Sequence, residues 1–408
     1  MNVDELVRDA LREQAAEQGF AGPGLADRVL ALHRRRRTRR IAAVAAATAA
    51  VVAVAVAVPL LDSGRKDTRP SDVIVDHKGI KGRPDQSPPR DLLSAGNTTL
   101  AAYSVSDTVK LSQDTAVVRR TYHLLDQRTG RYVKTTRWSW VAVAPGLKTA
   151  AVLEQDLPAS RIGLLDLTTG EVERWIQVDH KVAGLSFSRD GRKLVATTYT
   201  ENPDRLSKPH GQGDWGPMMQ TSRTGFYVLD VASGTGSWAE VKLKKDPDDP
   251  MGGLEMLNDR QDFSLTDDGR HVWAGNPSGK IGKEFWDLQG NAVSAPAGDK
   301  YLEWFVDAGK SPNGRLVAGD FAGEKWKTSS WLVDAMTGRR TEVRGQQLLA
   351  WVGDKQLIAW DIGRNDKNEF HQRLVLVTVG SAREIPLSGF RKGHDGDAGR
   401  WDPLFAEG

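Results

Sequence analysis

The sequence predicts an all-β body that follows one membrane-spanning helix, and three observations support this prediction. Two strand–turn–strand patterns alternate along residues 97–390, most of them turning at a glycine. Residues 41–61 form a continuous stretch without charged side chains. The 408-residue chain has no cysteine, which excludes disulfides and cysteine-based metal sites. The body must therefore be stabilised by its apolar core, to which 13 tryptophans contribute.

Residues 1–40 are expected to form short helices. Asn2 and Glu5 have the spacing of a capping box, and Gly19 is a plausible helix end. A second helix is expected to start near Pro23 and to run on toward the membrane. Each helix has only a narrow apolar stripe, which it cannot bury alone. The segment therefore either lies on the membrane surface or docks a cytosolic partner.

The apolar stretch IAAVAAATAAVVAVAVAVPLL, residues 41–61, is expected to be a transmembrane helix. At about 1.5 Å per residue it is roughly 31 Å long, which matches the hydrocarbon core of a bilayer. Positive charge is concentrated before it, and lysine and arginine tend to stay on the cytoplasmic side. Residues 1–40 are therefore expected to be cytoplasmic and residues 62–408 extracytoplasmic. The basic residues that are expected to contact anionic lipid headgroups are Arg34, Arg35, Arg36, Arg37, Arg39 and Arg40.

Two other interpretations of this stretch are open. One is a cleaved signal peptide with Ala55-Val56-Ala57 as its small-residue cleavage site. The other is a buried helix of a soluble domain. The net charge of the whole chain is only +3, so no nucleic acid is expected as a partner.

Two segments are expected to lack a fixed structure. Residues 62–96 are rich in Pro, Gly and charge and are expected to be a flexible linker. Residues 391–408 are expected to be a largely disordered tail, in which Trp401 and Phe405 could still pack against the body.

The first repeated pattern is a hairpin that turns at Asp-Gly or Asn-Gly. It occurs at residues 185–196, 263–274 and 311–318, with weaker copies at residues 141–146 and 351–360. The second pattern is a buried strand ending in Asp, then a turn that closes at Gly. It occurs at residues 124–130, 162–172, 227–234, 285–290 and 331–338, with a degenerate copy at residues 374–380.

Two hairpins in each period of about 40–60 residues give four strands per unit, and radial repetition of four-stranded sheets is the β-propeller. About six units can be counted in residues 97–390, and seven is the alternative. The Asp residues before the second turn, Asp166, Asp230, Asp287 and Asp334, are expected to cap turn amides rather than to do chemistry.

The repeats resemble the WD40-like units of TolB-type bacterial propellers, which read roughly F-S-P-D-G-x-x-L and then D-x-x-T-G. The copies around Asp190 and Asp268 are the most similar, and the resemblance covers about three quarters of the chain. The turn Pro is mostly missing here, and no regular Trp-Asp dipeptide marks the units. The resemblance implies the fold and does not imply a ligand.

Binding is expected on the face that carries the long loops, opposite the tight Asp-Gly and Thr-Gly turns, because recognition residues concentrate on loops held by a rigid scaffold. The candidate residues on these loops are His210, Trp215, Met218, Met219, Asp246, Asp248, Asp249, Lys325, Trp326, Lys327, Asp366 and His371.

No catalytic, cofactor or metal site is predicted. The acidic loop around Asp246 lacks the spacing and the glycine of a calcium loop, and the eight histidines have no ligand spacing. Ser186 lacks the second glycine of a nucleophile elbow.

The leading hypothesis is therefore a bacterial single-pass membrane protein whose extracytoplasmic propeller binds a protein, a peptide or a glycan without catalysis. A second hypothesis is a transmembrane anti-sigma-like regulator that acts through residues 1–40, because the layout resembles membrane-bound regulators of sigma factors. A third is a propeller hydrolase or lyase, which calls for carboxylates and His meeting at the channel mouth on the long-loop face.

Overall fold

The computed structural model describes residues 79–208, 215–218, 221–242, 260–275, 282–303, 305–363, 368–392 and 400–408. The predicted cytosolic helices, the predicted span 41–61 and residues 62–78 of the predicted linker lie outside this part. Of the candidate binding residues, His210, Met219, Asp246, Asp248, Asp249 and Asp366 also lie outside it. Among the described residues, no helix combines the length and the apolar character needed to cross a membrane.

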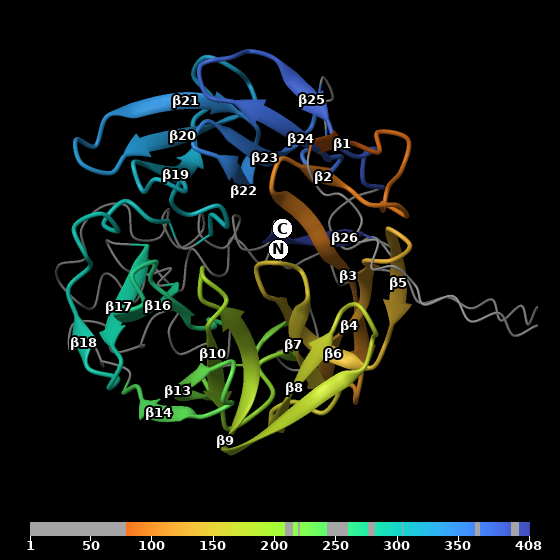
Figure 1. Cartoon of the computed structure of the whole chain (residues 1–408), viewed down its shortest axis with the longest axis vertical. Helices are drawn as coiled ribbons and strands as arrows, with labels where there is room; N and C mark the ends of the chain where they lie inside the picture. The colour runs from red at the N-terminus through yellow and green to blue at the C-terminus, as the bar shows by residue number, and fades with distance from the viewer. Residues whose placement is uncertain are drawn as a thin grey trace, which may run out of the picture.

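The described residues are all-β, and their sheets follow one another around a ring, as Figure 1 shows. The strands pair antiparallel, most of them with a strand close in sequence, so most groups form from a local stretch of chain. The pairings of β26 with β3 and of β11 with β4 join distant stretches. This radial arrangement of antiparallel groups is the predicted β-propeller. Apolar residues from neighbouring groups pack together, for example Leu348, Leu357 and Val375 with Ala318 and Leu332.

One long strand, β9, joins two neighbouring groups of strands, one of β6 to β8 and one of β10, β13 and β14. Its first half pairs with β8 and its last six residues pair with β10, so it leaves one group as the outer strand and enters the next as the inner strand. The strands of this sheet are β6 (Trp138–Val143), β7 (Thr149–Glu154), β8 (Ala159–Asp166), β9 (Val172–Phe187), β10 (Lys193–Tyr199), β13 (Arg223–Asp230) and β14 (Gly236–Glu240).

The next groups follow in chain order. They comprise β15 (Ser264–Leu265), β16 (His271–Gly275), β17 (Lys283–Asp287) and β18 (Ala292–Val293), then β19 (Leu316–Phe321), β20 (Ser329–Asp334) and β21 (Arg340–Arg344), then β22 (Gln347–Gly353), β23 (Gln356–Asp361), β24 (Arg373–Thr378) and β25 (Glu384–Pro386). The inner position beside β19 holds irregular chain, linked to it by the isolated bridge between Lys310 and Val317.

The ring is closed by β26, which pairs antiparallel with β3 over residues 98–105. The prediction of a disordered tail is therefore wrong for residues 401–407. Trp401 is 1% exposed, and its ring lies 5.7 Å from that of Tyr103 and 5.2 Å from that of Trp360. Burial of this large side chain and pairing with a strand about 300 residues earlier fix β26, and neither can be predicted from the local sequence.

The sheet that contains β26 also shows that the predicted linker ends earlier than residue 96. Leu93 is fully buried, and Gln86 accepts hydrogen bonds from the backbone N–H groups of Arg90 and Asp91. Residues 79–96 thus belong to the body. The strands of this sheet are β1 (Ile80–Lys81), β2 (Ser94–Ala95), β3 (Thr98–Lys110), β4 (Thr115–Asp126), β5 (Arg131–Thr135), β11 (Arg205–Ser207), β12 (Gly216–Pro217) and β26 (Trp401–Glu407).

The inner hairpins share one turn structure, which explains their repeated sequence. In the first, the Ser188 hydroxyl donates to Asp190 and accepts from the Lys193 N–H, while the Arg192 N–H donates to Asp190. Gly191 then takes a positive φ of 69°, which glycine adopts without steric cost. The same contacts recur at Thr266–Asp268 and at Ser311–Asn313.

The outer turns confirm that their repeated aspartates are capping residues. Each carboxylate accepts backbone N–H groups of the turn that follows it, as Asp166 does from Thr168 at 2.6 Å and Asp334 does from Thr337 at 2.9 Å. Asp230 and Asp287 make equivalent bonds.

Candidate functional site

A cavity of about 960 Å³ is lined by the inner strands β15, β22 and β26, by residues of β16, β17, β19 and β20, and by the irregular chain beside β19, and it is referred to as the central cavity. Its lining includes Arg189 and Asp267 of the tight inner turns and Glu407, the last residue of β26. It also includes Gln346, directly before β22, and Glu369, before β24. A volume of this size is within the range of natural ligand sites.

Charged side chains from four parts of the chain meet in the cavity lining. Arg189 lies 3.5 Å from Asp267 and 3.9 Å from Glu407. Lys310 lies 3.7 Å from Asp267 and 2.5 Å from Asp299, whose side chain is 3% exposed. These contacts join the turn after β9, the turn after β15, the irregular chain beside β19 and the end of β26. The lining thus offers both signs of charge, largely paired with each other.

Lys283, the first residue of β17, also lines the cavity and is 5% exposed. Its ammonium lies 3.4 Å from the centre of the Trp273 ring, which attracts a cation through its electron-rich face. Burial lowers the pKa of Lys283 to about 8, although Asp299, Asp307 and Asp267 act in the opposite direction.

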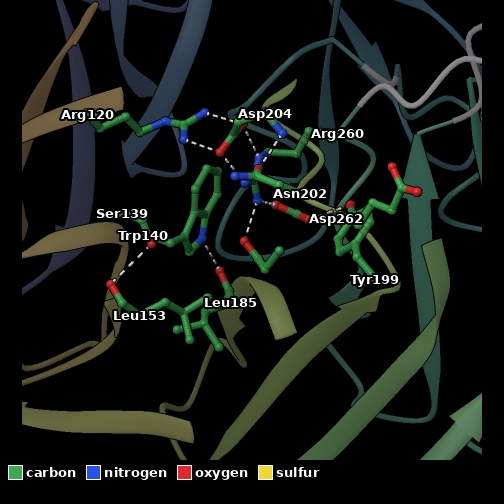
Figure 2. A network of polar contacts seen from close by, with 12 residues as sticks. Arg120, Ser139, Trp140, Leu153, Leu185, Tyr199, Asn202, Asp204, Arg260 and Asp262 are labelled. Carbon is green, nitrogen blue, oxygen red and sulfur yellow. Dashed lines mark hydrogen bonds and ion pairs between the residues drawn. The ribbon is translucent and has the colours of Figure 1, made fainter. Parts of the chain in front are cut away.

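A second polar cluster is buried between groups and is shown in Figure 2. Asp204 receives bidentate contacts from Arg120, at 2.7 and 2.9 Å, and from Arg260, at 2.6 and 3.0 Å. Arg260 also contacts Asp262 at 3.0 Å, and Tyr199 donates to Asp262 at 2.8 Å. Both guanidinium groups also contact the Trp140 ring. The central carbon lies 4.9 Å from the ring centre for Arg120 and 4.0 Å for Arg260.

The electrostatics of this cluster indicate a structural role. Burial by itself raises the pKa of Asp204, but the guanidinium groups of Arg120 and Arg260 outweigh it and hold that pKa well below its ordinary value. The carboxylate is thus permanently charged near neutral pH and has four N–H donors. It is poorly suited to transfer a proton, and it instead ties the segment around residue 204 to β4 through Arg120 and to the irregular chain before β15 through Arg260.

The structure does not bring the described candidate residues together. Trp215 lies under the Lys208 ammonium, at 4.7 Å, beside β12. The backbone N–H groups of Lys325 and Trp326 donate to Glu342, between β19 and β20. His371 stacks on Phe390 with ring centres 4.6 Å apart. None of the six described candidates, which include Met218 and Lys327, is among the residues that line the cavity.

Sequence reasoning missed the charged residues of the cavity, although the repeat contains a signal for them. Arg189 and Asp267 both occupy the position before the turn aspartate, which the ring geometry directs toward the centre. No histidine is among the described residues that line the cavity. In all of the described residues, no group of three or more acidic or histidine side chains could hold a metal ion.

No family model and no curated protein matches the sequence. Among solved structures, the chain is similar to the uncomplexed acylaminoacyl peptidase of Pyrococcus horikoshii, with 13% identity and a TM-score of 0.39 over 69% of this chain and 44% of the peptidase. It is similar to hydrazine synthase of Kuenenia stuttgartiensis, with 13% identity and a TM-score of 0.35 over 77% and 80% of the two chains. It is also similar to TolB from Acinetobacter baumannii, with 14% identity and a TM-score of 0.34 over 71% and 67%.

The chain spans less than half the length of the Pyrococcus peptidase. At TM-scores this low the three likenesses carry no inference about activity. The propeller assignment rests on the strand pairing and the ring of sheets.

Proposed function

We propose that the chain is a membrane-anchored binding module without catalytic activity, whose extracytoplasmic propeller takes a segment of a protein, a peptide or a glycan into its central cavity. The observation that carries the proposal is the cavity of about 960 Å³, lined by both signs of charge. A rigid ring of paired sheets around a preformed cavity lowers the entropic cost of binding.

The lining supports a polar, extended ligand. Gln346 and Gln347 line the cavity, and an amide group can both donate and accept hydrogen bonds, as peptide backbones and sugar hydroxyls require. The Gln372 amide is engaged within the protein, since it donates to Gln346 and accepts from Arg391 and Arg400. Phe305 and Trp351 in the same lining offer apolar contacts to side chains or to sugar faces. The charged side chains of the lining are largely paired with each other, so the cavity has no strong net charge and does not select a ligand by the sign of its charge.

Binding in the cavity is tested with the detergent-solubilised full chain on arrays of peptides and of oligosaccharides. We expect a consistent set of ligands that Gln347→Trp loses, because the indole fills part of the cavity. Val133→Trp is the matched control, since Val133 lies outside the cavity and is 53% exposed. Equal binding by both variants, or no binding by the parent chain, contradicts the proposal.

The membrane arrangement can be tested with single cysteines, because the chain has none of its own. Gln113→Cys lies at the exposed tip between β3 and β4, and Gln14→Cys lies in the predicted cytosolic segment. In right-side-out membrane vesicles we expect a membrane-impermeant maleimide to label the first and not the second. The reverse pattern refutes the orientation, and a mature N-terminus just after Ala57 refutes the anchor.

The proposal includes six blades. Its support is that β6 to β9, β9 to β14, β15 to β18, β19 to β21, β22 to β25, and β26 with β3 to β5 each correspond to one unit. An experimental density map of the full chain that contains a seventh radial sheet overturns this number.

A further inference from the structure

We propose that Lys283 is a carbonyl-reactive amine, which condenses reversibly with a small aldehyde or ketone that enters the central cavity. This goes beyond the proposed non-covalent binding and does not depend on it. The ligand class is an uncharged carbonyl compound with an apolar group, because Trp273, Leu302 and Phe305 line the same cavity.

The position of Lys283 is unusual for a lysine. Its side chain starts at the end of β17 that pairs with Gly275, and it is buried with the Trp273 ring as the contact of its ammonium. The nearby carboxylate of Asp299 is engaged by Lys310 at 2.5 Å. In the described part of the chain, Lys283 forms no ion pair of its own, whereas Lys310 forms two.

Burial favours the neutral form of the amine and outweighs the groups that favour the ammonium, among them the Trp273 ring. Burial acts most strongly and lowers the pKa of Lys283 to about 8. Asp299, Asp307 and Asp267 favour the charged form, and Lys310 disfavours it. At pH 7.5 about a quarter of the side chain is then the free amine, against about a thousandth for an ordinary lysine.

The chemistry requires no cofactor or oxidant. The lone pair of the neutral Nζ attacks the carbonyl carbon and forms a C–N bond, while the carbonyl π electrons move to oxygen, which then takes up one of the two protons of the nitrogen. The resulting carbinolamine loses its hydroxyl group with the remaining nitrogen proton as water. The product is an imine, and the same steps in reverse release the ligand. Buried lysines with a lowered pKa are the ones that use this reaction in proteins.

The test is reductive trapping with benzaldehyde and cyanoborohydride on the detergent-solubilised full chain, between pH 6 and pH 10. Mass spectrometry of peptides measures the benzylation rate of each lysine. At pH 7.5 we expect Lys283 to react at least about tenfold faster than the exposed Lys355, with a midpoint near pH 8. Unfolding in urea should abolish the difference.

Lys134→Met is the matched control, since it removes an exposed amine of β5 outside the cavity and should leave the reaction of Lys283 fast. Lys283→Met should remove the fast phase from the total rate. If Lys283 in the parent chain reacts no faster than Lys355, the proposal is wrong whether or not the variants fold. Because benzaldehyde needs no array ligand, this failure is distinguishable from failure of the proposed binding function.

Discussion

The buried Asp204 gives a quantitative test of what holds the ring together. Asp204→Asn keeps the shape of the side chain and removes its charge. The cluster of Arg120, Arg260, Asp204 and Asp262 then changes from two positive and two negative charges to a net charge of +1. The amide NH₂ group must also face a guanidinium donor, so contacts of Asp204 are lost without replacement.

The magnitude follows from burial. The side chains of Arg120, Arg260 and Asp204 are 15%, 12% and 6% exposed. Breaking a buried pair by removing one partner costs about 3–5 kcal/mol, because the other charge remains buried. We expect a loss of about 4 kcal/mol in the free energy of unfolding. With a urea m-value of about 3 kcal/mol/M, the midpoint should fall by about 1 M.

The assay is urea unfolding of the full chain followed by tryptophan fluorescence. Glu154→Gln is the control, since that carboxylate contacts Arg161 at 2.8 Å and the two side chains are 37% and 43% exposed. It should cost less than about 1 kcal/mol. The double variant Arg120→Met with Asp204→Asn should recover part of the loss, because it removes one uncompensated charge. If Asp204→Asn costs no more than Glu154→Gln, the buried network is not a source of stability.

Three further predictions use the same unfolding assay. The folded pKa of Asp204 lies below its unfolded value of 3.8, so its contribution to stability is complete above about pH 5 and is lost as the pH falls through the folded pKa. The difference in the free energy of unfolding between the parent chain and Asp204→Asn should therefore narrow between pH 5 and pH 3. A constant difference contradicts the assigned pKa. Trp401→Ala should cost about 3–5 kcal/mol by leaving a cavity in the closing sheet, whereas a cost below about 1 kcal/mol shows that β26 does not hold the ring. Gly191→Ala should cost about 1–2 kcal/mol because φ is 69° there. Gly298→Ala should change stability by less than about 0.5 kcal/mol, because Gly298 has open space around it and no positive φ. Equal effects of the two substitutions argue against the turn assignment.

The turns and most strands could be predicted because their information is local. The Ser188-to-Gly191 turn satisfies its own polar groups, and its copies at Thr266 and Ser311 do the same. An aspartate that caps the following amides is likewise readable from sequence. Alternation of apolar and polar residues then places the strands between these turns.

The errors lie where structure depends on distant partners. β26 forms a strand because β3, about 300 residues earlier in the chain, offers an unpaired inner edge. The burial of Leu93 depends equally on residues about 300 positions later in the chain, because Leu387 and Trp401 pack in the same apolar cluster. The cavity charges were missed for a similar reason, since Asp299 and Lys310 lie in irregular chain without a repeat pattern. The membrane span and the roles of residues 1–40 remain predictions.

The pairing of β26 with β3 has a consequence for how the molecule is made. The inner edge of β3 stays unpaired until β26, about 300 residues later in the chain, has been synthesised. Pairings of such long sequence separation form slowly, and bare strand edges are prone to join the wrong chain. A nascent copy is therefore vulnerable to aggregation until β26 has paired, and deletion of residues 400–408 should produce misassembly out of proportion to the length removed.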